Sequence, residues 1–149
     1  MEQLSRALAD HRILGLDTPV FIYHLEANQT YLRLTKEIFS SMQEGRWQAV
    51  TSTITLLEVT VPAWRQSQES IARQYETLLI NFPNLMVLDI NREVARLAAQ
   101  LRAVYHLRTP DALQVAASQI GGATVLITND RNLKRLEKAI DVVILSDYC

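Results

Sequence analysis

The sequence predicts a single α/β domain with a central parallel sheet of four to five strands and helices on both of its faces. Strand and helix signals alternate along the whole chain, which is typical of parallel strands joined by right-handed crossovers. The expected strands are short, and the run Val125-Leu126-Ile127 is apolar throughout, which is typical of a strand covered on both faces. No repeat, low-complexity tract or linker interrupts the 149 residues, so we expect one domain.

In the first half of the chain, helix caps and apolar runs set the expected elements. A short helix over 2–11 precedes a strand over 13–16, so residues 1–12 are expected to form a helical extension before the domain core. Thr18 can cap the next helix, with Pro19 at its first position. Two further elements are expected in this half: a helix over 30–42 ended by Gly45, and a weaker strand over 47–51.

In the second half, Ser52 or Thr53 can cap a helix whose apolar side carries Ile54, Leu57, Glu58 and Val61. Asn91 can cap a long amphipathic helix. The other expected elements are helices over 70–82 and from 109 to the Gly121-Gly122 pair, and strands over 85–88, 123–128 and 142–145.

The composition is that of an ordinary globular protein, with 48% hydrophobic and 21% charged residues. No apolar run approaches the roughly 20 residues that cross a bilayer, and Cys149 is the single cysteine, so we expect a cytoplasmic protein with no membrane partner. The formal net charge is −1. Binding to a polyanion would therefore require a local basic patch or a bound metal.

Two aspartates are expected at one edge of the sheet. Asp17 follows the first strand directly, and Asp130 lies two residues beyond the strand that ends at Thr128. Ligand sites of such sheets lie beyond the carboxyl ends of the strands. The alternative for each residue is a simple helix cap.

Two further acids lie on helices. Glu58 shares a helix side with Leu57 and Val61, and a buried carboxylate there needs a cation, a hydrogen bond or a proton. A salt bridge to an arginine is the alternative. Asp111 lies in the first turn of the helix that begins at Thr109, where the helix dipole favours an anion. Its alternative is a surface position stabilised by that dipole.

Taken together, the four acids indicate a metal site. Several carboxylates at one edge repel one another unless positive charge joins them. Oxygen ligands of this kind suit one or two Mg²⁺ or Mn²⁺ ions, which can activate a water and clamp a phosphodiester for hydrolysis. Thr18, Thr128 and Asn129 are expected to orient the carboxylates or to bind a water, with capping as the alternative.

Four segments of the chain resemble motifs of the PIN domain family, particularly of toxins of the VapC type. They are Asp17-Thr18-Pro19-Val20-Phe21-Ile22-Tyr23, Thr53 through Glu58, Thr109 through Ala117 and Leu126 through Leu133. Their order and spacing match the family from Ile13 to Leu145. The resemblance implies a metal-dependent endoribonuclease with Asp17, Glu58, Asp111 and Asp130 as ligands. It also implies an antitoxin partner and a homodimer.

The sequence departs from the family in two places. Pro19 stands where the family usually has a polar residue, often asparagine, so a hydrogen-bonding side chain is missing beside the expected site. Residues 1–12 precede the first strand, whereas the family usually begins almost at that strand. Neither departure removes an acid.

Among basic residues, Arg131, Lys134 and Arg135 follow Asp130 closely and are the best candidates for contact with RNA phosphates. Arg65, Arg73 and Arg108 are weaker candidates. The alternative for all of them is a solvated helix face. Trp47 and Trp64 are expected in the core or in helix packing.

Other functions remain as alternatives to a nuclease. A non-catalytic RNA- or protein-binding module on the same fold is the main one, although no acid is lost. A receiver domain would need adjacent acids after the first strand and a lysine after the last, and neither pattern is present. A dinucleotide site would need a glycine-rich turn between a strand and a helix, whereas Gly121-Gly122 ends a helix.

Overall fold

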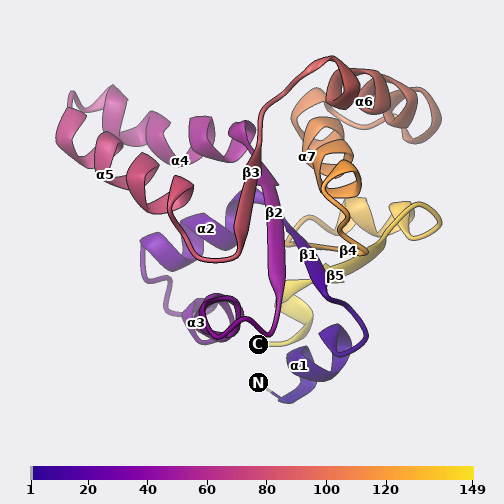
Figure 1. Ribbon diagram of the computed structural model, residues 1–149, viewed down its shortest axis with the longest axis horizontal. Coiled ribbons are helices and arrows are strands. Elements are labelled where there is room, and N and C mark those ends of the chain that lie inside the picture. The colour runs from indigo at the N-terminus through magenta and orange to yellow at the C-terminus, as the bar shows by residue number, and fades with distance from the viewer. Residues whose placement is uncertain (1) are drawn as a thin grey trace.

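A computed structural model describes residues 2–149 and confirms the predicted α/β class (Figure 1). All five strands are parallel, and their order in the sheet is β3-β2-β1-β4-β5. The order places β1 at the centre, so the chain winds outward from it in both directions. The strands are β1 (Ile13–Leu16), β2 (Gln48–Ser52), β3 (Leu85–Leu88), β4 (Val125–Thr128) and β5 (Asp141–Ile144).

Helices cover both faces of this sheet, as the sequence predicts. One face is packed by α1 (Glu2–Leu8), α2 (Thr18–Leu25), α3 (Leu32–Gln43), α4 (Thr53–Arg65) and α5 (Glu69–Ile80). The other is packed by α6 (Arg92–Tyr105), α7 (Thr109–Ile120) and the short 3₁₀ helix η1 (Arg131–Leu136). A second 3₁₀ turn, η2 (Leu145–Asp147), follows β5.

The strands alternate their side chains between the two cores. Val125 and Ile127 of β4 pack into the core under α2 and α3, whereas Leu126 packs under α6 and α7. All three side chains are fully buried. The continuous apolar run of β4 thus reflects burial on both faces of the sheet.

Gly15 allows α7 to lie very close to the central strand. A Cβ atom at Gly15 would lie 2.4 Å from the Oγ of Ser118, a contact that no side chain could make. Because α7 begins two turns before Ser118, this close packing carries Asp111 toward the carboxyl end of β1. The glycine therefore helps to position the site.

The N-terminal helix α1 packs on the domain instead of extending away from it. Leu4 and Leu8 are fully buried in the core under α2 and α3, and the Ser5 hydroxyl donates a hydrogen bond to Glu37 of α3. Met1 lies outside the described residues. No helix within residues 2–149 has the length and apolarity that a bilayer crossing requires.

Several local expectations are wrong in detail. Asp17, not Thr18, is the N-cap of α2, because its side chain accepts the Thr18 amide. The buried side of α4 carries Thr55, Val59, Thr60 and Ala63, so Glu58 and Leu57 are exposed. Trp47 is buried as expected, whereas Trp64 is half exposed on α4. The apolar spacing of α4 identified the wrong side because Thr55 and Thr60 share the buried side with Val59 and Ala63, whereas the larger Leu57 is exposed.

Candidate active site

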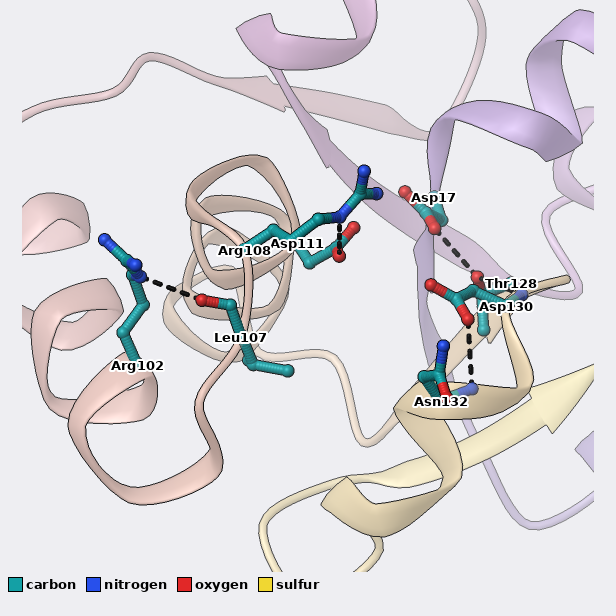
Figure 2. A network of polar contacts seen from close by, with 8 residues as sticks. All are labelled: Asp17, Arg102, Leu107, Arg108, Asp111, Thr128, Asp130 and Asn132. Carbon is teal, nitrogen blue, oxygen red and sulfur yellow. Dashed lines mark hydrogen bonds and ion pairs between the residues drawn. The ribbon is translucent and has the colours of Figure 1, made fainter.

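Asp17 and Thr128 form the centre of the predicted site, at the carboxyl ends of the neighbouring strands β1 and β4. The Thr128 hydroxyl donates to Oδ2 of Asp17 at 2.8 Å (Figure 2). The Thr18 amide donates to Oδ1 of Asp17 at 2.9 Å. The parallel pairing of β1 with β4 brings these residues together, although 111 positions separate Asp17 from Thr128 in the sequence.

The Asp17 carboxyl group is buried and electrostatically strained. Only 8% of the residue is exposed, and no basic side chain of the described chain pairs with it. Burial is the main cause that raises its pKa from the ordinary 3.8 to about 6. The hydrogen bonds from Thr128 and Thr18 oppose the rise, whereas the negative charges of Asp111 and Glu58 add to it.

Glu58 reaches the same site from α4, but from an exposed position. Its Oε1 accepts a hydrogen bond from the Thr18 hydroxyl at 2.8 Å. Burial against apolar neighbours therefore does not explain this acid, contrary to the expectation from its spacing. The contact with Thr18 and the repulsion of Asp17 place its carboxylate beside the end of β1.

Asp111 lies across from Asp17, in the first turn of α7 (Figure 2). Its carboxylate accepts a hydrogen bond from Nε of Arg108 at 3.1 Å, and its side chain is only 15% exposed. As predicted, its helix face turns inward, because Gln114, Val115 and Ser118 are buried.

Asp130 completes the set of four acids on this edge of the sheet. Its Oδ1 caps η1 by accepting the Asn132 amide at 3.0 Å, and its own amide donates to the Thr128 hydroxyl at 3.2 Å. Asp17 and Asp130 therefore have the capping role that was the alternative for each, and their role as metal ligands stays a prediction. Each aspartate caps a helix, and each lies at the expected edge (Figure 2).

Beneath the acids lies a buried hydrogen-bond network that the sequence interpretation missed. Gln114 of α7 donates through Nε2 to the hydroxyls of Thr18 at 3.1 Å and Thr55 at 2.8 Å, and its Oε1 accepts from Ser52 at 2.5 Å. Thr51 adds a hydrogen bond to Thr55 at 2.7 Å. The signal was present in the polar Thr51-Ser52 pair at the end of a buried strand and in Gln114 within an apolar helix face.

The remaining predicted residues are placed differently. Asn129 orients no carboxylate: its amide nitrogen donates to the Tyr23 hydroxyl, and its oxygen accepts from the amide and hydroxyl of Ser146. Arg131 pairs with Asp147 at 2.6 Å, and Lys134 pairs with Glu137 at 2.9 Å. Arg135 is exposed. Their contact with RNA stays a prediction.

The four acids fit a divalent cation in chemistry and in charge. All the side-chain donors are carboxylate oxygens, which Mg²⁺ and Mn²⁺ prefer, and a cation beside Asp17 would relieve the strain that raises its pKa. The side chains are not gathered around one point, however. Within residues 2–149, no three Asp, Glu, His or Cys side chains are arranged to hold an ion as they stand.

The five-stranded parallel sheet, with acidic residues at its carboxyl edge, places this protein among the α/β proteins that carry a site at the ends of their strands. Comparison of the sequence with family models then identifies the family. The sequence model of the PIN domain family matches residues 15–139, so the chain belongs to the PIN domain family. No curated protein matches the chain in sequence.

Solved structures with the same fold include toxin–antitoxin proteins. A toxin–antitoxin complex from Klebsiella pneumoniae is 25% identical, has a TM-score of 0.64, and the match covers 90% of this chain and 97% of that one. VapBC2 from Rickettsia felis, solved with a promoter DNA fragment, is 15% identical with a TM-score of 0.66, covering 89% and 98%. FitAcB from Neisseria gonorrhoeae is 19% identical with a TM-score of 0.68, covering 90% and 98%. The last two show the fold alone.

Proposed function

We propose that the protein is a metal-dependent endoribonuclease that hydrolyses RNA phosphodiester bonds, and that it is the toxin of a toxin–antitoxin pair. The observation that carries the proposal is the strained Asp17 carboxyl, which lies buried beside three other acids drawn from α4, α7 and the end of β4. PIN domains are in general nucleases and typically depend on divalent metals, and this chain keeps all four acids of the family pattern.

Asp17, Glu58, Asp111 and Asp130 would hold Mg²⁺ or Mn²⁺. When bound, such an ion polarises the scissile phosphate and lowers the pKa of water. The protein's own residues keep the acids in place for this chemistry. The Thr128 hydroxyl fixes Oδ2 of Asp17, and Gln114 holds the Thr18 hydroxyl that donates to Glu58.

The toxin assignment and the antitoxin partner rest on likeness to the complexes described above. We propose a cognate antitoxin on that basis. The proposed homodimer rests on the resemblance of the sequence motifs to VapC-type toxins, and the proposed cytoplasmic location rests on the composition of the sequence. The RNA would approach the acidic edge, with Arg131, Lys134 and Arg135 of η1 as candidate phosphate contacts.

The test is cleavage of pooled single-stranded RNA by protein that size-exclusion chromatography shows to be free of a second chain. Reactions with Mn²⁺, Mg²⁺ or EDTA compare the wild type with an Asp17→Ala/Asp111→Ala variant. An Asp10→Ala/Asp141→Ala variant is the matched control, because it removes two acids near the opposite edge of the sheet. Cleavage should require metal and should fall more than about 100-fold in the first variant, since loss of an outer partner alone costs 10- to 100-fold. The control should stay within about twofold of the wild type.

Folded protein that binds Mn²⁺ but cuts no RNA under any of these conditions would contradict the proposal. That result would favour the non-catalytic binding module. Equal cleavage by the two double variants would show that the acidic edge is not the active site.

A further inference from the structure

The backbone around Arg108 is held in place by its neighbours, close to the four acids. It lies in the three-residue connection between α6 and α7 and is the N-cap of α7. Arg102 of α6 donates through Nε to the Leu107 carbonyl at 2.8 Å, and the Leu107 side chain is buried (Figure 2). The backbone on both sides of Arg108 is therefore fixed, and its side chain starts from a defined point near Asp111.

The guanidinium group of Arg108 is only partly engaged. Its Nε donates to Oδ2 of Asp111, whereas neither Nη atom has a hydrogen-bond partner among the described residues. The Arg108 side chain is 77% exposed although its partner is only 15% exposed. Four N–H donors, on the two Nη atoms, thus remain without a partner on a planar group at the open side of the acidic site.

Arg108 also acts as the counter-charge of this edge. Its hydrogen bond and charge interaction with Asp111 raise its pKa, and the charges of Asp130 and Glu58 contribute in the same direction. Three of the four acids therefore act on one guanidinium. A cation that replaced Arg108 at Asp111 would meet the same favourable field.

We propose that Arg108 competes with the divalent ion for Asp111 in the free protein, and that it binds an RNA phosphate once the ion has displaced it. This inference rests on the proposed function. An exposed ion pair is weak, so its release opposes metal binding only slightly. A planar guanidinium matches phosphate oxygens in a bidentate manner, so the freed group gains a suitable partner beside the acids.

Arg108 is better placed for this role than the basic residues of η1. Arg131 is paired with Asp147, and Lys134 bonds both Glu137 and the Val142 carbonyl, and neither pairing involves one of the four acids. Displacement of Arg108, in contrast, is coupled to the event that makes the site competent. The same movement would take the Arg108 guanidinium group away from Asp111 and make it available to a phosphate of the RNA.

The first measurement is Mn²⁺ affinity by titration calorimetry without RNA, for wild type, Arg108→Gln and Arg73→Gln. Arg73 is a weaker candidate for phosphate contact, but it lies on α5, which carries none of the four acids. It is the matched control because it is a similarly exposed arginine paired with a carboxylate, Glu69. Arg108→Gln should bind Mn²⁺ roughly two- to fivefold more tightly, the fold-change expected for loss of an exposed ion pair. Arg73→Gln should match the wild type.

The second measurement is RNA binding over a range of salt concentrations, with each arginine variant in an Asp17→Asn background to suppress cleavage. Mn²⁺ is held at a concentration that calorimetry shows to saturate this background, so that the ion is bound throughout. Loss of one phosphate contact should lower the slope of log affinity against log salt by about 0.7 for single-stranded RNA. We expect that decrease for Arg108→Gln and no change for Arg73→Gln. Arg108→Lys keeps the charge but not the planar fork, so it should retain wild-type Mn²⁺ affinity and show weaker RNA binding.

Unchanged or weaker Mn²⁺ affinity in Arg108→Gln would overturn the inference, because it would mean that Arg108 does not compete or that it supports Asp111. An unchanged salt slope would overturn the phosphate contact. If the wild type binds Mn²⁺ and cuts RNA, and Arg108→Gln has the same Mn²⁺ affinity and the same salt slope as the wild type, only this inference fails. A wild type that neither binds Mn²⁺ nor cuts RNA overturns the proposed function, and this inference with it.

Discussion

At the carboxyl edge of the sheet, Asp17 follows β1 directly and lies beside Thr128, the last residue of β4. At the opposite edge, Asp141 and Thr124 lie on either side of His11, next to the starts of β5 and β4. There the His11 ring contacts the Thr124 hydroxyl at 2.7 Å and the Asp141 carboxylate at 3.4 Å. The two edges thus present the same residue types in different surroundings.

The surroundings decide which edge is a candidate site. Asp141 has a side chain that is 67% exposed and a neighbour that can carry positive charge. Asp17 is buried, accepts hydrogen bonds only from neutral donors, and is repelled by Asp111 and Glu58. An aspartate at a strand end therefore indicates little by itself. Burial together with unbalanced negative charge distinguishes the carboxyl edge.

The largest expected difference between the edges is in stability. Because the pKa of Asp17 is raised in the folded state, ionisation of its carboxyl destabilises the metal-free protein as pH rises from about 4 to about 6. The difference between 3.8 and about 6 corresponds to about 3 kcal/mol. Asp17→Asn should therefore stabilise the protein by up to that amount at pH 7.5 in EDTA, and asparagine keeps the cap of α2. The gain should vanish at pH 4.

Thermal denaturation of Asp17→Asn and Asp141→Asn across this pH range is the measurement. Asp141→Asn should lower stability by less than about 1 kcal/mol, because it removes only an exposed pair. Saturating Mn²⁺ should stabilise the wild type more than Asp17→Asn, by preferential binding to the folded state. Destabilisation by Asp17→Asn at pH 7.5 in EDTA would show that the carboxylate is not strained.

A smaller effect is expected when the two glutamines of α7 are compared. Gln114 points beneath the carboxyl edge, whereas Gln119, one turn and a half later, donates to the Ala139 carbonyl from a more exposed position. Gln114→Met removes three hydrogen bonds to the buried hydroxyls of Thr18, Ser52 and Thr55 and should lower the free energy of unfolding by about 1–3 kcal/mol. Gln119→Met should cost less than about 1 kcal/mol. Urea denaturation would measure both, and equal losses would argue against an organised network under the acids.

The smallest expected effect is that of removing the hydroxyl of Thr128, at the carboxyl edge, compared with removing that of Thr124, at the opposite edge. Thr128→Val removes the hydroxyl that holds Oδ2 of Asp17 and accepts the Asp130 amide, so Mn²⁺ affinity should fall about tenfold. Thr124→Val removes a hydroxyl at the opposite edge and should leave Mn²⁺ affinity unchanged. Calorimetric titration of both variants is the test, and matching affinities would remove Thr128 from the site.

Much of this fold was predictable because its signals are local. The apolar runs, the Asn91 cap of α6 and the Thr109-Pro110 start of α7 each depend on neighbours within a few residues, and the structure confirms them. Expectations failed where small polar residues face the core. On α4, Thr55 and Thr60 are buried while Leu57 is exposed, so the apolar spacing pointed to the wrong side.

The sequence alone determined the order of the elements, the two-faced burial of β4 and the positions of the four acids at strand ends and on helices. Only the tertiary structure decided which residues contact those acids and how deeply each acid is buried. Gln114 reaches Thr18 across 96 positions, and Gly15 lets α7 approach β1 closely enough for that contact. Such pairings depend on the order of the strands and on the fit of a helix against the sheet. Neither is encoded in the spacing of residues along one element, so the strain on Asp17 and the role of Arg108 emerge only from the folded chain.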